Sequence, residues 1–212
     1  VLKTAYKETA VRGNGIAANI TKDYPEGIEW YDQNLDKAKQ LLEKAGYGEG
    51  FSKTLTYYYD TGRSARRKIG LIWKENLNEL GIDIELQSRD WPVMADKVDK
   101  GDFELYASGD WTSLPTSGGY TDQMESRNLG VSGNFAWIEN NTLDVLNEKA
   151  RTIFNTEKRT QIYREMHGVI FDLAPIISVV QMKNINVYGE WVKGFKYYPW
   201  SHIYFYDMYK EG

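Results

Sequence analysis

A strand–helix–strand pattern in the first half of the chain limits its fold more than any other feature. Residues 54–59 are rich in threonine and tyrosine, and residues 82–86 alternate between apolar and polar side chains, so both segments predict β-strands. Between them, apolar residues recur at helical spacing from Ser64, a candidate N-cap, to a stop at Gly81. Two strands joined through a helix are parallel in most folds. The unit therefore predicts an α/β fold, with a mixed sheet flanked by helices around a βαβ core.

The same signals predict a further helix and strand, followed by a long loop. Asp90 is placed to cap the helix and Gly101 to end it, and residues 103–108 are expected to form the strand. Residues 109–136 show no periodicity. A loop of that length inside a compact domain is usually functional or flexible.

The last third of the chain predicts two helices and several strands. The helices are expected to be capped by Asn141 and Thr156. Residues 175–180 and 185–188 predict strands, and the aromatic tail at residues 191–209 is expected to be strand-like.

Composition and charge exclude several classes of protein. Of the 212 residues, 42% are hydrophobic and 26% are charged, which is typical of a soluble globular protein with a core. The net charge of −4 argues against nucleic acid or an anionic membrane surface as the main partner. No cysteine is present, so disulfides and thiolate zinc sites are excluded. No apolar run is long enough to span a membrane, and the first four residues lack the apolar core of a signal peptide.

A short capped helix is expected at residues 34–45. Asn34 is a good N-cap, and Gly46 is placed to adopt the left-handed conformation that ends a helix. The apolar residues form one stripe, as in any amphipathic surface helix: Leu35, Ala38, Leu41, Leu42 and Ala45.

With Tyr31-Asp32 before it and Gly46-Tyr47 after it, this helix resembles a family signature. It is similar to the signature helix of the extracytoplasmic solute-binding proteins of the dipeptide, oligopeptide and nickel type, the family 5 receptors of ABC importers. Other segments resemble motifs of that family in the same order: Ser64-Ala65-Arg66-Arg67, Gly101-Asp102-Phe103-Glu104, Thr142-Leu143-Asp144, residues 171–176 and residues 191–195. The matches extend over nearly the whole chain.

The resemblance implies one lobe of a two-lobed, periplasmic-binding-protein-like receptor. Family members are over twice as long, so the chain corresponds to a C-terminal portion. Residues 1–190 would form the ligand-binding lobe II, and residues 191–212 a tail that returns toward the missing N-terminal lobe I. Such a receptor binds a small molecule by hinge closure and docks to an ABC permease. The implied location is periplasmic or extracellular, including lipid anchoring of the full-length parent, and no cofactor, metal or catalytic residue is implied.

Candidate ligand-binding residues follow the expected strand at residues 103–108, because ligands of open α/β sheets lie at the carboxyl ends of strands. Asp110 could accept hydrogen bonds from hydroxyl or ammonium groups, and Trp111 could stack on a sugar ring or a side chain. The next candidates are Tyr120, Asn134 and Trp137.

The resemblance adds two candidates and leaves the ligand class open. Dipeptide-binding members hold the ligand carboxylate with an arginine at a position that falls near Tyr59 here, with Arg63 four residues later. Asp110 could replace the aspartate that pairs with the peptide amino terminus, but the residues after Trp111 depart from the peptide-binding pattern. The aromatic content and these departures favour an oligosaccharide, with an oligopeptide as the alternative. Nickel is disfavoured, because the chain has two histidines and one, His167, falls inside a helix.

An enzyme and an isolated carbohydrate-binding module are the remaining alternatives. The sequence contains no P-loop, no His-Glu-x-x-His motif and no nucleophile elbow. A carbohydrate-active hydrolase would need a pair of acids across a cleft, and scattered acidic residues do not establish one. A carbohydrate-binding module is usually all-β, which the expected helices contradict. The sequence therefore favours a binding protein that is not an enzyme.

Overall fold

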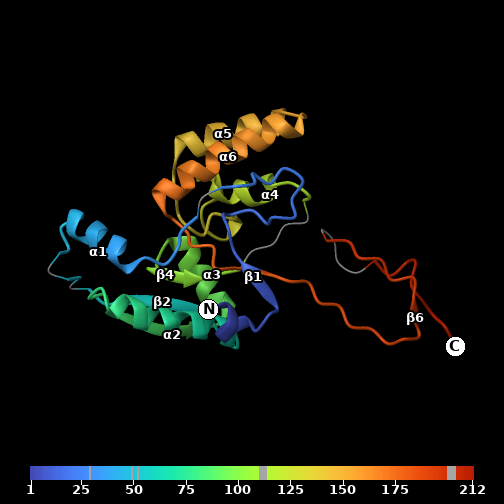
Figure 1. The fold of residues 1–212 in the computed structure, drawn as a ribbon, viewed down its shortest axis with the longest axis horizontal. Coiled ribbons are helices and arrows are strands. Elements are labelled where there is room, and N and C mark those ends of the chain that lie inside the picture. The colour runs from blue at the N-terminus through green and yellow to red at the C-terminus, as the bar shows by residue number, and fades with distance from the viewer. Residues whose placement is uncertain (29, 49, 52, 110–113, 200–203) are drawn as a thin grey trace.

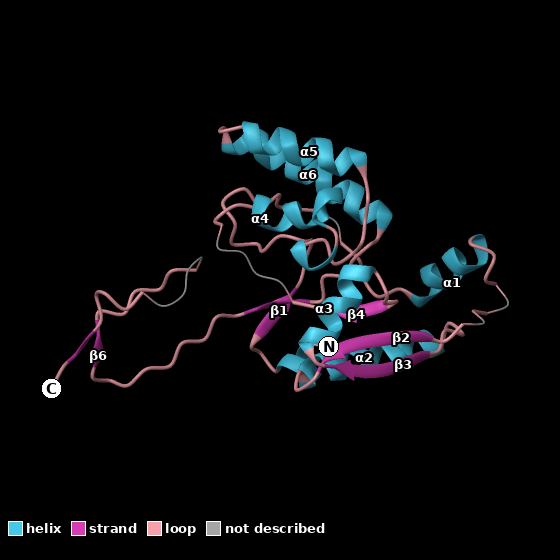
Figure 2. Ribbon diagram, turned by 180° about the vertical axis from the view of Figure 1, so that it is seen from behind, coloured by secondary structure: helices cyan, strands magenta, loops and turns pink. Residues whose placement is uncertain are grey.

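The computed structural model describes the chain except for residues 29, 49, 52, 110–113 and 200–203. Figure 1 shows a sheet with its helices, a pair of long helices stacked beyond it, and a C-terminal segment that extends away from both. The view from behind, in Figure 2, shows the same arrangement. The fold is thus an α/β lobe with an extended tail.

The central sheet consists of three parallel strands in the order β3-β2-β4. The middle strand β2 (Leu55–Asp60) pairs with β3 (Ile84–Arg89) and with β4 (Leu105–Ala107). The predicted parallel pairing through a helix is confirmed. Among the described residues, antiparallel pairs occur only outside this sheet. The central sheet is therefore parallel, and not the mixed sheet that the sequence predicted. Because parallel strands run the same way, their carboxyl ends meet at one edge, where β2 ends at Asp60.

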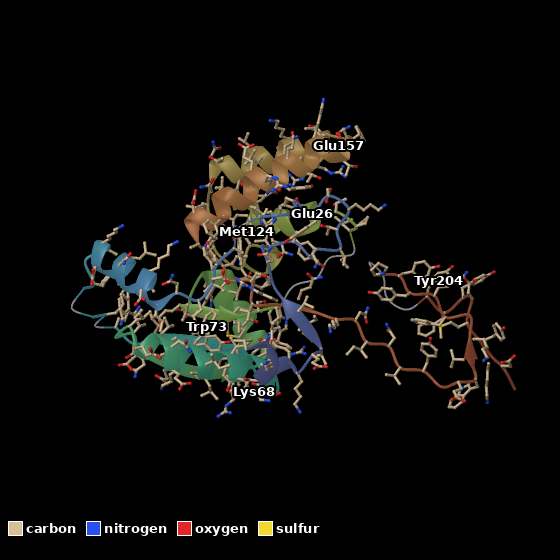
Figure 3. All side chains as sticks on the ribbon, in the orientation of Figure 1. Glu26, Lys68, Trp73, Met124, Glu157 and Tyr204 are labelled. Carbon is tan, nitrogen blue, oxygen red and sulfur yellow. The ribbon has the colours of Figure 1, made fainter. Side chains whose placement is uncertain are left out.

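Helix α2 (Ser64–Asn78) lies close against the sheet because a glycine faces it. A Cβ atom at Gly70 would lie 2.5 Å from Cε1 of Tyr57, a strand residue that is only 1% exposed. A larger side chain at that point would hold the helix away from the strand. The apolar core between helix and sheet includes Tyr57, Ile69, Trp73, Leu77, Ile84 and Leu86, and Figure 3 labels Trp73 within it.

The predicted N-cap of this helix is wrong by one residue. Arg63 occupies the N-cap position and makes no side-chain capping hydrogen bond, whereas Ser64 is already the first helical residue. The chain turns tightly before the helix, with the Arg63 N–H donating to the carbonyl of Asp60 over 3.1 Å. This turn begins the helix without the help of a serine side chain.

The expected boundaries of two other helices are confirmed. Helix α3 (Trp91–Lys100) follows Asp90 and ends at Gly101, whose φ is 65°. Helix α1 (Leu35–Lys44) is capped by Asn34, whose side-chain oxygen accepts a hydrogen bond from the Lys37 N–H over 2.8 Å. No residue of α1 is buried, so its apolar stripe is only partly covered in this chain.

The long helices α5 (Asn141–Thr152) and α6 (Thr156–Leu173) pack against each other over the second apolar core. Each begins one residue earlier than expected: the side chains of Asn140 and Asn155 accept hydrogen bonds from N–H groups three residues on. In each helix the asparagine just before the predicted cap is the N-cap, because its backbone is extended there. The core under these helices contains Trp30, Met124, Leu143, Leu146, Ala150, Ile162, Tyr163, Met166 and Ile170.

The region between β4 and α5, expected to be a loop, contains short helical turns. They are α4 (Gly118–Thr121) and three 3₁₀ turns at Asp122–Met124, Ser126–Asn128 and Gly130–Ser132. Turns this short leave no helical periodicity in the sequence, which explains why the pattern did not predict them.

A buried ion pair joins three distant segments beneath α6. The carboxylate of Asp23, which is 1% exposed, accepts hydrogen bonds from Arg159 Nε over 2.7 Å and from the Ser117 backbone N–H over 2.6 Å. The hydroxyl oxygens of Ser117 and Thr21 lie 3.0 Å apart in the same cluster. The N-terminal loop is thereby tied both to α6 and to the start of α4.

Near its ends the chain forms two small antiparallel pairs. β1 (Ala10–Arg12), which follows a π-helical turn at Leu2–Tyr6, pairs with β5 (Val180–Met182). β6 (Val192–Lys193) pairs with β7 (Tyr209–Lys210) in the tail.

Two strands predicted in this part of the chain are wrong. Only the last residue of the segment 175–180 enters a strand, as the start of β5, and residues 185–188 form no regular element. Their apolar composition resembles that of strands, but backbone pairing requires a neighbouring strand that the described residues do not supply.

Candidate functional site

A cavity of about 340 Å³ lies at the carboxyl edge of the parallel sheet. Its lining comes from the end of β2, from β4 and the residues just after it, from the starts of α2 and α3, and from Phe135 in the segment before α5. The side chains that matter most for its chemistry are Asp60, Arg63, Arg66, Trp91, Tyr106 and Phe135. This is the edge at which open α/β sheets bind ligands, so the cavity is the candidate site.

A hydrogen-bonded group of three side chains forms one side of the cavity. Arg66 Nη1 pairs with Oδ2 of Asp60, and the Tyr106 hydroxyl donates to Oδ1 of the same carboxylate over 2.9 Å. Burial, followed by the hydrogen bond to Asp60, raises the pKa of Tyr106 to about 12, so the phenol remains a donor at neutral pH. Both oxygens of Asp60 are therefore engaged within the protein.

The rest of the cavity combines exposed charges with aromatic rings. Arg63 and Asp90 are exposed, and the described residues offer neither side chain a hydrogen bond or an ion pair. Trp91 is 49% exposed, and Phe135 is half-buried. Such a surface can bind a small polar or charged group and cover it with apolar rings.

The candidate loop residues Asp110 and Trp111 lie outside the described residues. The residue before them, Gly109, lines the cavity, and so does Arg63. Of the seven residues proposed from sequence, Arg63 is the one that the described structure places in this cavity.

Asn134 and Trp137 are used in packing and lie outside the cavity lining. Asn134 is fully buried, and its amide donates to the carbonyls of Glu125 and Ile138 over 3.0 and 2.7 Å. Trp137 Nε1 donates to the carbonyl of Val98, near the C-terminal end of α3, whereas the cavity lies at the start of that helix. Their position in a glycine-rich segment gave no sign of these internal contacts.

Tyr59 and Tyr120 also lie outside the cavity lining. Tyr59 packs against the core between the sheet and α2, and Tyr120 is a partly buried residue of α4. Sequence reasoning missed Asp60, Arg66 and Trp91, although each lies at the end of a strand or the start of the next helix. The rule that ligands gather at the carboxyl ends of strands, applied to β2 and β3 as well as β4, would have found them.

The remaining polar features of the described residues do not form a second site of known type. No group of three or more potential metal ligands occurs among the described residues. His167 is a buried residue of α6, only 2% exposed, and His202 lies outside the described part of the chain. No helix in the described part of the chain has the length and apolar character needed to cross a membrane.

Comparison with known proteins identifies relatives among binding proteins. The oligopeptide-binding protein AppA of Bacillus subtilis is 25% identical over 211 residues, covering 91% of this chain and 38% of that protein. The probable D,D-dipeptide-binding periplasmic protein DdpA of Escherichia coli is 29% identical over 204 residues, covering 88% of this chain and 38% of its own length. The chain thus spans about two fifths of the length of these relatives.

Solved structures show the same fold. The oligopeptide-binding protein AppA of B. subtilis, in complex with a nonapeptide, matches with a TM-score of 0.79 at 19% identity, over 100% of this chain and 44% of that structure. DppA of Helicobacter pylori, in complex with the peptide STSA, matches with a TM-score of 0.80 at 21% identity, over 100% and 41%. The family model described as "Bacterial extracellular solute-binding proteins, family 5 Middle" matches residues 1–129. The chain therefore belongs to the family 5 bacterial extracellular solute-binding proteins, as the motifs in its sequence indicated.

Proposed function

We propose that this chain is part of the substrate-binding component of an ABC importer, and that the ligand is a peptide. The observation that carries the proposal is the cavity at the carboxyl edge of the sheet, in a chain of a solute-binding family. The names of the relatives supply the ligand class, since one is an oligopeptide-binding protein and another a probable D,D-dipeptide-binding protein.

The oligosaccharide favoured by the sequence receives no support from these relatives, and the oligopeptide alternative replaces it. The high aromatic content had indicated a surface that binds carbohydrate. Many aromatic side chains instead fill the core, such as Tyr57, Trp30 and Tyr163, or lie on the tail. The cavity carries two arginines and two aspartates, which suit a ligand that bears charges of its own.

The binding site is completed by an N-terminal lobe that precedes this chain in the parent protein. Residues 1–190 act as lobe II, and residues 191–212 return toward lobe I. The exposed tail supports this division: Phe205 is 70% exposed, Tyr206 is 86% exposed, and neither belongs to an apolar core cluster. The two lobes close around the ligand by a hinge, and the closed form docks to the permease.

Three of the loop and cavity residues are assigned to the ligand. Arg63 contacts it directly, and Asp110 and Trp111, which follow the cavity residue Gly109, contact it from the loop. The other residues predicted from the sequence to bind the ligand lie outside the cavity lining and stay predictions: Tyr59, Tyr120, Asn134 and Trp137. The receptor transforms no substrate, and it works outside the cytoplasmic membrane, where lipid anchoring would hold the parent at the cell surface.

A thermal-shift screen of the full-length parent tests the proposal. Short peptides are expected to raise the melting temperature in proportion to the logarithm of their concentration, and neutral oligosaccharides are not. Stabilisation by oligosaccharides alone would overturn the ligand class. Turnover of any ligand during the assay would overturn the receptor function itself.

A further inference from the structure

Two glycines in the N-terminal loop are required by close packing. A Cβ atom at Gly13 would collide with Oγ of Ser178, and the Gly13 N–H donates to the carbonyl of Val179 over 3.2 Å. A Cβ atom at Gly15, whose φ is 84°, would lie 2.5 Å from Cε1 of the buried His167. Only glycine fits at either position, because any other residue would hold the loop away from its neighbours.

Asn14, the residue between these glycines, is exposed. The Tyr24 hydroxyl donates to the backbone carbonyl of Asn14 over 2.8 Å, so the main chain is held on that side. The side-chain nitrogen of Asn14 lies 3.5 Å from the same hydroxyl, which is longer than an ordinary hydrogen bond. The side-chain amide is therefore only weakly held by the fold.

The order of residues makes this amide chemically reactive. In an Asn-Gly step, the backbone nitrogen of the glycine can approach the side-chain carbonyl carbon of the asparagine, because no Cβ atom obstructs it. Asn14-Gly15 is the only such step in the sequence. Among the described residues the Gly15 N–H donates no hydrogen bond, so no backbone acceptor competes for it. The glycine that packing requires against His167 thus leaves Asn14 open to attack by its own chain.

We propose that Asn14 is a modification site, at which the side chain loses its amide spontaneously. The Gly15 nitrogen attacks Cγ of Asn14, so that a bond forms between these atoms while the bond from Cγ to Nδ2 breaks. The Gly15 proton leaves with Nδ2 as ammonia, and a succinimide ring remains. Water then adds to either ring carbonyl and breaks its bond to nitrogen, which leaves an aspartate or an isoaspartate at position 14. The reaction needs no co-reactant but water, and the inference is independent of the proposed ligand.

Either product changes the loop at a closely packed point. Both products add a negative charge beside the Tyr24 hydroxyl. Isoaspartate also routes the backbone through the side chain and lengthens it by one carbon, between two glycines whose neighbours leave no room for a methyl group. The same loop carries Asp23, which pairs with Arg159 of α6. Isoaspartate is therefore expected to loosen the loop from α6 and to lower the melting temperature, and aspartate to have the smaller effect.

Ageing of the purified 212-residue chain at mildly alkaline pH tests the site. Peptide mapping by mass spectrometry follows the replacement of the amide NH₂ by OH at each asparagine. The internal control is Asn19, which lies in the same loop, precedes Ile20 and exchanges hydrogen bonds with Gln181. Asn14 is expected to react at least about tenfold faster than Asn19, because the β-branched side chain of Ile20 obstructs the attacking nitrogen. Equal rates at the two positions would overturn the proposal.

A synthetic peptide with the sequence of residues 10–20 measures what the fold contributes. The rate at Asn14 in the folded chain is expected to lie within about tenfold of the rate in the peptide, because Asn14 is exposed and the Gly15 N–H is unpaired among the described residues. A rate at least about a hundredfold slower in the folded chain would show that the fold protects Asn14, and would contradict the proposal.

Two substitutions separate the modification from its consequences. N14Q keeps a side-chain amide but lengthens it, so that the attack would have to close a larger ring. After ageing, the wild-type chain should accept methyl groups from isoaspartyl methyltransferase, and N14Q should accept far fewer. Equal methylation of the two would place the reaction elsewhere and overturn the proposal. N14D carries the new charge on an ordinary backbone, and an aged wild type that melts at the same temperature as N14D would contradict the effect expected of the longer backbone.

The full-length parent provides the final arm of the experiment. Asn14 is expected to react in the aged parent as it does in the 212-residue chain. An intact Asn14 in the aged parent would overturn the proposal for the receptor. None of these measurements uses a peptide ligand, so their failure is distinct from a failure of the proposed function.

Discussion

The body of the lobe and its C-terminal tail use the same kinds of side chain in opposite ways. In the body, Tyr57 and Tyr163 are 1% and 3% exposed within two apolar cores. In the tail, Tyr204 and Tyr206 are 51% and 86% exposed, and Figure 3 shows Tyr204 far from the packed layers. The residue types do not decide burial; the presence of a covering element does.

The comparison shows where the stability of the chain originates. In the body, α2, α5 and α6 cover the aromatic residues. The buried carboxylate of Asp23 is paired there with the guanidinium of Arg159. The tail has one short antiparallel pair, β6 with β7, and contacts within itself such as the ring pair Tyr198–Tyr204, whose centroids lie 6.1 Å apart. We therefore expect substitutions in the body to change the free energy of unfolding, and equivalent substitutions in the tail to leave it unchanged.

The largest difference is expected between a buried and an exposed ion pair. Arg159→Met leaves the buried Asp23 without its cation and should lower the free energy of unfolding by about 3–5 kcal/mol in urea titrations followed by circular dichroism. Lys196→Met breaks the exposed Lys196–Asp207 pair of the tail and should have no measurable effect. Equal effects of the two substitutions would remove the distinction between body and tail.

A pH dependence of stability is expected from His167 in the body. Burial, with a smaller contribution from the Arg164 charge, lowers its pKa from 6.5 to about 4, so it remains neutral in the fold while the unfolded chain binds a proton below pH 6.5. Stability should therefore fall between pH 6.5 and pH 4, by about 3 kcal/mol from this residue. The measurement is the difference between wild type and His167→Leu in urea titrations at several pH values. A difference that stays constant with pH would contradict this assignment.

Two helix glycines provide a matched test of packing in the body. Gly70→Ala places a methyl group 2.5 Å from the Tyr57 ring, and should cost about 1–2 kcal/mol through overpacking. Gly168→Ala, on α6, meets no atom within 4 Å and should stabilise by up to about 1 kcal/mol through helix propensity. Both values come from thermal or urea unfolding. The same sign for both variants would show that α2 does not lie as close to the sheet as described.

The smallest effect is expected in the tail itself. Tyr206→Ser should change the unfolding free energy of the chain by less than about 0.5 kcal/mol, because the side chain is 86% exposed. In the full-length parent, where lobe I is proposed to cover the tail, the same substitution should cost more. An equal effect in the two proteins would argue against that role of the tail.

The sequence predicted the elements of the fold that depend on local hydrophobic spacing and on helix capping. The β2-α2-β3 unit, the α1 cap at Asn34 and the left-handed glycine at 101 follow from periodicity and capping chemistry, and the structure confirms them. The strands expected at residues 175–180 and 185–188 failed because strand formation requires a pairing partner, which a pattern within one segment cannot supply.

The candidate cavity lies at the edge of the sheet where the sequence placed the site, but of the predicted residues only Arg63 lines it among the described residues. The carboxyl edge of the sheet was the expected location, yet attention to a single strand missed Asp60, Arg66 and Trp91. Asn134 and Trp137 were predicted from a glycine-rich loop, and in the structure their side chains donate to internal backbone carbonyls, so a role in ligand binding stays a prediction. Contacts between distant segments decide such cases, and they are not visible in local sequence.

Calorimetric titration of an oligopeptide into the full-length parent, and into the 212-residue chain alone, tests the central claim most directly. The account predicts micromolar or tighter binding by the parent, and binding at least about a hundredfold weaker by the chain, a loss of about 2.7 kcal/mol. Equal affinity of the chain and the parent would contradict the claim that a second lobe completes the site. No peptide binding by the parent would contradict the claim that the protein is a peptide receptor.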